Sequence, residues 1–170
     1  MAKGTVSPKL PVGALDNTLV LAPVVIKAAT ATPLLPLGLP DGPGGSGVIL
    51  EFDLGAIGDP IAGGIAYTIT LQEGDDAAGG DLALVGAESV IGSAGAGTNA
   101  QGGTFASGVV AVVNAADEDS QKYAIAYVGK RSFIKATITP ANLPGGPVGL
   151  PVSVTARVIN PRYVGGFLQS

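Results

Sequence analysis

The most informative part of the sequence is Gln121-Lys-Tyr-Ala-Ile-Ala-Tyr-Val-Gly-Lys-Arg-Ser-Phe-Ile-Lys-Ala-Thr-Ile-Thr139. On both sides of Gly129-Lys130, large apolar residues alternate with small or polar ones. A period of two, rich in β-branched and aromatic side chains, is typical of half-buried strands. Glycine in the first position of a two-residue loop suits a type II′ turn. The stretch therefore predicts a β-hairpin.

The same stretch carries Lys122, Lys130, Arg131 and Lys135, four of the nine basic residues in the chain. Charge is segregated along the sequence. No Lys or Arg occurs from 28 to 121, whereas twelve of the thirteen acidic residues do. The acidic middle and the basic ends are expected to neutralise each other. Two arrangements remain open: cross-strand pairs within one sheet, or head-to-tail contacts between subunits.

Further strands are expected on both sides of this stretch. Residues 48–54 and 65–72 alternate clearly, and residues 105–113 and 152–158 follow the same period. A first strand over 17–27 contains Pro23, which confines it to a sheet edge or breaks it. A short strand is expected within 81–85, and no helical pattern stands out. The sequence predicts an all-β protein, an antiparallel β-sandwich of jelly-roll-like connection.

Glycine and proline set the expected domain limits. Twenty-seven Gly and thirteen Pro are well above the usual share of about 12%. We expect an extended N-terminal arm over residues 1–46, the sandwich over 47–160 and a tail over 161–170. The Gly/Ala/Ser-rich run 88–104 is expected to be a flexible loop, or an ordered one if a partner holds it. Within the arm, a leucine-bearing and proline-stiffened segment is expected to pack on its own domain or on a neighbour: Leu34, Leu35, Leu37 and Leu39.

Composition argues against catalysis. The chain has no Cys, His or Trp, which removes disulfides, thiolate metal sites and the usual general base at neutral pH. Glu73 to Asp81 holds four carboxylates, but the spacing does not follow the EF-hand pattern, so we expect a solvated acidic turn. The glycine runs contain no phosphate-binding motif. We therefore expect no enzyme, no metal and no cofactor.

Partners are constrained by charge and hydropathy. A net charge of −4 is unfavourable for nucleic-acid binding. The apolar run from 19 to 26 is too short to span a membrane and contains a proline, and no signal peptide is recognised. We expect a protein made in a cytoplasm that binds neither nucleic acid nor membrane. The low charged fraction, 13%, is typical of a subunit that buries surface in an assembly.

Two stretches together resemble a known family. They are Tyr67-Thr-Ile-Thr-Leu-Gln-Glu-Gly-Asp-Asp76 and the stretch from Gln121 to Ile138. They are similar to decoration (cement) and other auxiliary virion proteins of tailed bacteriophages, which share a strand, an acidic turn and a later Gly-x-Lys-Arg-Tyr-x-Arg pattern. Gly129, Lys130 and Arg131 are taken as the Gly, Lys and first Arg of that pattern. Phe133 and Lys135 stand one position later than the family's Tyr and Arg, with Ser132 as the extra residue.

The resemblance implies a non-enzymatic protein on the exterior of a phage capsid, made in the host cytoplasm. Its implied partners are the major capsid protein and further copies of itself, as a trimer. The hypothesis assigns the capsid contact to Leu34, Leu35, Leu37, Leu39, Lys130 and Arg131.

The alternative hypothesis is a carbohydrate-binding or adhesive β-sandwich of a head fibre or tail. Such a module needs an exposed aromatic platform, and only 5% of the residues are aromatic. The candidates for it are Tyr123, Tyr127, Phe133, Tyr163 and Phe167.

Overall fold

The computed structural model describes residues 17–37, 47–59 and 64–159. Within these ranges the chain is almost entirely β, with one short 3-10 helix, η1 (Ala87–Ser89), and no α-helix. The long strands are β1 (Asn17–Ile26), β4 (Gly47–Leu54), β5 (Ala66–Gly74), β9 (Val109–Val113), β10 (Lys122–Tyr127), β11 (Phe133–Ala141) and β12 (Leu150–Ile159). The short ones are β2 (Thr30–Ala31), β3 (Leu35–Pro36), β6 (Ala83–Leu84), β7 (Val90–Gly92) and β8 (Gly95–Ala96).

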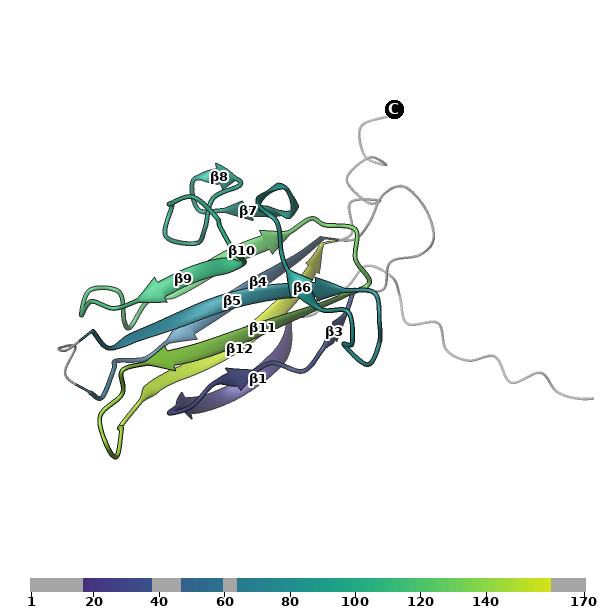
Figure 1. The fold of residues 1–170 in the computed structure, drawn as a ribbon. Helices are drawn as coiled ribbons and strands as arrows, with labels where there is room; N and C mark the ends of the chain where they lie inside the picture. The colour runs from purple at the N-terminus through teal and green to yellow at the C-terminus, as the bar shows by residue number, and fades with distance from the viewer. Residues whose placement is uncertain (1–16, 38–46, 60–63, 160–170) are drawn as a thin grey trace, which may run out of the picture.

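The strands form two antiparallel sheets that face each other (Figure 1). Sheet A has the order β1-β12-β4-β10-β7-β8. Sheet B has the order β2-β11-β5-β6, with β3 also paired to β11 and β9 also paired to β5. The predicted β-sandwich is confirmed, and the strand with Pro23 lies at an edge of sheet A, as its proline requires. The jelly-roll-like connection stays a prediction.

The core lies between the sheets and follows the period of two. In β4 and β5 the inward residues are fully or almost fully buried, whereas their neighbours in sequence are half-buried or exposed. Such alternation is what an antiparallel sheet with one solvated face needs. The largest fully buried side chains come from both sheets, among them Phe52, Tyr67, Ile125, Tyr127 and Ile134.

The predicted hairpin is wrong. β10 pairs with β4 and β7 in sheet A, whereas β11 pairs with β5, β2 and β3 in sheet B. The chain between them therefore crosses from one sheet to the other. The apolar stripes of the two strands therefore face the core from opposite sheets and do not lie side by side in one sheet. A period of two shows only that one face of a strand is buried, and both arrangements bury it equally.

The predicted arm does not extend through residues 17–37. β1 pairs with β12 in sheet A, and β2 and β3 pair with β11 in sheet B. Leu37 is only 4% exposed and Leu35 packs against the core, so this segment packs on its own domain. Apolar and polar residues alternate too irregularly around Pro33 and Pro36 for the sequence to reveal two-residue strands. Residues 1–16, 38–46 and 160–170, which include Leu39 and the predicted tail, lie outside the described residues.

The run 88–104 is ordered by its own chain. β7 pairs with the end of β10 and so extends sheet A. Gln101 of this run bonds to β9 of sheet B. Its side-chain amide donates to the Val112 carbonyl oxygen at 2.8 Å and accepts the Val112 N–H at 2.9 Å. This side chain therefore takes the place of a neighbouring strand at the edge of β9, which would otherwise present unpaired backbone groups. Side-chain caps of this kind leave no periodic signal in a sequence.

Candidate functional site

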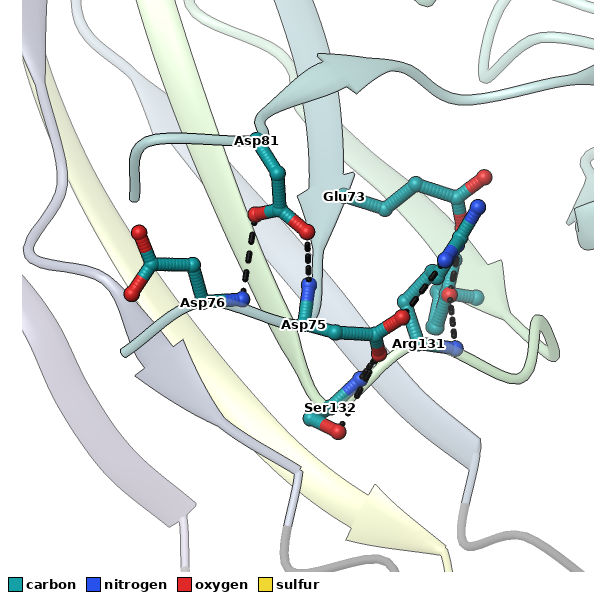
Figure 2. A network of polar contacts seen from close by, with 7 residues as sticks. Glu73, Asp75, Asp76, Asp81, Arg131 and Ser132 are labelled. Carbon is teal, nitrogen blue, oxygen red and sulfur yellow. Dashed lines mark hydrogen bonds and ion pairs between the residues drawn. The ribbon is translucent and has the colours of Figure 1, made fainter. Parts of the chain in front are cut away.

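The crossing between the sheets brings together the two stretches that carry the resemblance. β5 of sheet B ends in the acidic turn, and β10 of sheet A ends just before Gly129, Lys130 and Arg131. The side chains that join them are called the acidic-turn network below. Its members are Glu73, Asp75, Asp76, Asp81, Tyr127, Arg131 and Ser132 (Figure 2).

Asp75 is the centre of the network. One of its carboxylate oxygens accepts from Arg131 Nη1 at 2.5 Å. The other accepts from the Ser132 N–H at 2.9 Å and from its Oγ at 3.2 Å. The hydrogen bonds from Arg131 and then from Ser132 stabilise the charged form and lower the pKa of Asp75 below its ordinary value. Both Asp75 and Arg131 remain about half exposed, so the ion pair fixes geometry more than it adds stability.

Asp81 shapes the turn itself. Its two oxygens accept the backbone N–H groups of Asp75 at 2.8 Å and of Asp76 at 3.0 Å, as Figure 2 shows. These two bonds lower the pKa of Asp81. Asp76 in turn accepts the N–H groups of Ala78 and Gly80. The carboxylates of Asp76 and Asp81 therefore accept from backbone donors of the turn, which is the role expected of a structural acidic turn.

Tyr127 joins the sheets beneath the ion pair. Its side chain is fully buried, its hydroxyl donates to Glu73 Oε2 at 2.5 Å, and its oxygen accepts the Arg131 N–H at 3.2 Å. Burial first, and the Glu73 bond second, raise the pKa of Tyr127 well above its ordinary value. The sequence analysis missed this bond because Glu73 lies on the other sheet.

Gly129 has a role different from the predicted one. It does not adopt a positive φ, so it is not the turn residue of a type II′ hairpin. A Cβ at this position would lie 2.3 Å from the Tyr127 hydroxyl oxygen and 2.4 Å from Cζ. Glycine is required here because the tyrosine ring occupies the space.

The predicted contact residues fall into two groups. Leu35 and Leu37 are used inside the sandwich, as described above. Leu34 is partly buried and lies beside Gly79 of the acidic turn, and the Leu37 N–H donates to the Ser132 carbonyl oxygen at 2.9 Å. Leu34, Lys130 and Arg131 thus gather at one end of the sandwich, although the sequence separates them by almost a hundred positions. We call this the connector end: residues 33–37, 73–82 and 128–132.

The connector end exposes both apolar and basic groups. Val128 is 46% exposed, and Lys130 is exposed beside it. A shallow groove of about 270 Å³ lies between Glu73, Glu88 and the segment 128–131. In the described part of the chain, no group of three or more His, Cys, Asp or Glu residues is placed to hold a metal ion.

Two ion pairs within the chain join residues of the acidic middle to basic residues that follow it. Arg131 pairs with Asp75, and Arg157 of β12 pairs with Glu51 of β4 at 3.7 Å. The second is a cross-strand pair of the kind expected within one sheet. The ranges given above also contain no helix with the length and hydropathy that a membrane span requires.

The aromatic platform of the alternative hypothesis is not formed by the tyrosines of β10. Tyr123 is 8% exposed and Tyr127 is fully buried. Phe133 is partly buried. Tyr163 and Phe167 lie outside the described residues.

No protein-family model, curated protein or solved structure matches the chain significantly.

Proposed function

We propose that the chain is a non-enzymatic structural protein of a phage particle, bound to the exterior of the capsid through its connector end. One observation carries the proposal. The acidic turn and the Gly129–Lys130–Arg131 segment, which together produce the resemblance to decoration proteins, are bonded to each other through Asp75 and Arg131. If the two segments resemble the family because they share its structure, they should lie in contact with each other. A chance resemblance would not require that contact.

The proposed contact differs from an arm that contains all four leucines. Leu35 and Leu37 serve the core, so the partner-facing residues are Leu34, Val128 and Lys130, with Arg131 held in place by Asp75. An exposed apolar side chain beside charged groups is typical of protein interfaces. The partner is the major capsid protein, and further copies of the chain are expected beside it. Binding to the assembled shell, and not to free subunits, shifts the equilibrium toward the shell.

The test is co-sedimentation of the purified protein with empty capsids of its source phage. We expect a fixed stoichiometry and a higher melting temperature of the shell. Sedimentation of the protein alone measures whether copies associate. Binding to a glycan array, with no binding to shells, would instead favour the adhesive module.

Point variants locate the contact, because deletion of residues 1–46 would remove β1, β2 and β3 and unfold the sandwich. Val128→Asp and Lys130→Glu should each weaken shell binding by about tenfold or more, equivalent to about 1.4 kcal/mol. Lys122→Glu is the matched control, since Lys122 is exposed at the opposite end of β10. Equal binding by all three variants would overturn the assignment of the connector end.

A further inference from the structure

The outer faces of the two sheets differ in polarity. Between residues 68 and 72 of β5 and between 135 and 139 of β11, the outward residues of sheet B are all polar: Thr68, Thr70, Gln72, Lys135, Thr137 and Thr139. Sheet A instead carries an apolar groove of about 350 Å³ on its outer face, lined by Ile49, Ala126 and Ile91 among others. Ile91 is 43% exposed although it is a large aliphatic side chain. A solvated sheet face is normally polar, so the outer face of sheet A is suited to an interface.

One row of paired residues crosses sheet A at this groove. Ile49 pairs with Ala126, Ala126 pairs with Ile91, and Ile91 pairs with Ala96. Residues paired in this way point to the same side of a sheet, and all four are half-buried or exposed. The row therefore alternates large and small apolar side chains across four neighbouring strands, β4, β10, β7 and β8 (Figure 1).

Such a row is complementary in shape to a second copy of itself. A two-fold axis parallel to the strands, between β10 and β7, reverses the direction of the row. It brings Ile91 opposite the partner's Ala126, and Ile49 opposite the partner's Ala96. A large side chain then faces a small one at every position, which lets two packed layers interdigitate. A two-fold contact needs a patch that fits its own copy, and this row meets that condition.

The charges on this face are balanced and border the apolar row. Glu51 and Asp53 of β4 are accompanied by Lys122 of β10 and Arg157 of β12. A second copy carries the same net charge of −4 and is repelled on average, whereas this face has two acidic and two basic side chains. An apolar centre with a charged border is typical of protein interfaces.

We propose that two copies of the chain associate through the outer faces of sheet A about this axis, with Ile91 of each copy packed against Ala126 of the other. Four strands at about 4.8 Å span about 19 Å, and the six residues of β10 about 20 Å, so each copy buries roughly 400 Å². That is about half of what each partner of a standard interface buries, so the dimer is weak. The inference concerns a face other than the connector end and does not depend on the proposed function.

Sedimentation velocity of the full chain, from about 0.02 to 1 mM, tests the contact over the range in which a weak dimer forms. We expect a sedimentation coefficient that rises with concentration toward that of a dimer. Ile91→Asp should abolish the rise, because it buries a charge opposite an alanine. Thr139→Asp is the control and should keep the rise, because Thr139 is exposed on β11 of the opposite sheet.

A mixing experiment tests the arrangement itself. Ala126→Ile places two large side chains opposite each other, and Ile91→Ala places two small ones opposite each other. Each variant alone should therefore dimerise about tenfold more weakly than the unaltered protein. In an equimolar mixture, a pair made of one copy of each variant again has a large side chain opposite a small one at both positions. The mixture should therefore associate as strongly as the unaltered protein.

Positions 91 and 126 are also neighbours within one sheet, but an effect inside one chain cannot depend on mixing two variants. The melting curve of each variant by circular dichroism confirms that it is folded.

Four outcomes overturn the proposal. The first is an unaltered protein that stays monomeric up to about 1 mM, and the second is association that Ile91→Asp leaves unchanged. The third is a trimer with no dimer, which would favour a three-fold contact. The fourth is a mixture that associates no more strongly than the two variants do separately.

Discussion

Replacement of Tyr127 by phenylalanine tests whether the acidic-turn network holds the two sheets together. The substitution removes one oxygen and keeps the ring in the core. It deletes the bond to Glu73 Oε2 and leaves the Arg131 N–H without its acceptor. A hydrogen bond to a charged group contributes about 1.5 to 3 kcal/mol. Glu73 is partly exposed, so its carboxylate can form hydrogen bonds with water in the variant. We therefore expect the free energy of unfolding to fall by about 2 kcal/mol, near the middle of that range.

The assay is urea unfolding followed by far-ultraviolet circular dichroism at pH 7, with thermal unfolding beside it. A loss of about 2 kcal/mol corresponds to a decrease of about 4 to 8 °C in the melting temperature of a domain of this size. A double-mutant cycle with Glu73→Ala isolates the bond, and we expect a coupling energy of about 1 to 2 kcal/mol.

Tyr123→Phe is the matched control. Tyr123 is also a buried tyrosine of β10, but its hydroxyl donates to the neutral carbonyl oxygen of Glu118 at 2.9 Å, within one stretch of chain. Its removal should lower the free energy of unfolding by about 1 kcal/mol. If Tyr127→Phe lowers stability no more than Tyr123→Phe, and shows no coupling to Glu73→Ala, the bond between the sheets contributes nothing and the reasoning fails.

Three further predictions concern the same fold. Gly129→Ala should lower the free energy of unfolding, measured in urea, by about 1 to 3 kcal/mol, because the added Cβ meets the Tyr127 ring. Gly145→Ala should leave it unchanged, because the space around Gly145 is open. Leu37→Ala should lower the free energy of unfolding by about 2 to 4 kcal/mol, because Leu37 is buried in the core. Leu84→Ala, at an exposed position, should lower it by less than about 0.5 kcal/mol. Above about pH 10 the unfolded chain releases the Tyr127 proton that the folded chain retains, so thermal unfolding from pH 7 to 11 should show stability falling as pH rises, and less steeply in Tyr127→Phe.

Most strands were predictable from local pattern. β4, β5 and β12 alternate over eight residues or more, and alternation of that length specifies both the strand and its buried face. β2 and β3 were missed because each pairs over two residues only, which is too short for any period to register. They exist because β11 offers them an open edge, which is a property of the assembled sheet.

The candidate site likewise has parts that were predictable from local pattern and contacts that were not. The acidic turn and the Gly129–Lys130–Arg131 segment were recognisable as a shared pattern, yet nothing in the sequence indicated that Asp75 and Arg131 are bonded. Their contact depends on where β5 and β10 end, on two different sheets. The prediction of Leu37 as a partner contact failed for a related reason, since an apolar residue in a proline-rich segment gives no indication of the surface it meets.

The all-β sandwich follows from local sequence properties alone. The period of two and the abundance of glycine and proline are local properties, and each limits the backbone wherever it occurs. The assignment of β10 and β11 to opposite sheets, and hence the bond from Tyr127 to Glu73 between the sheets, is visible only in the folded chain. The physical reason is that an alternating strand buries its apolar face equally well in a hairpin or across a sandwich. The choice between them depends on pairing partners that lie far away along the chain.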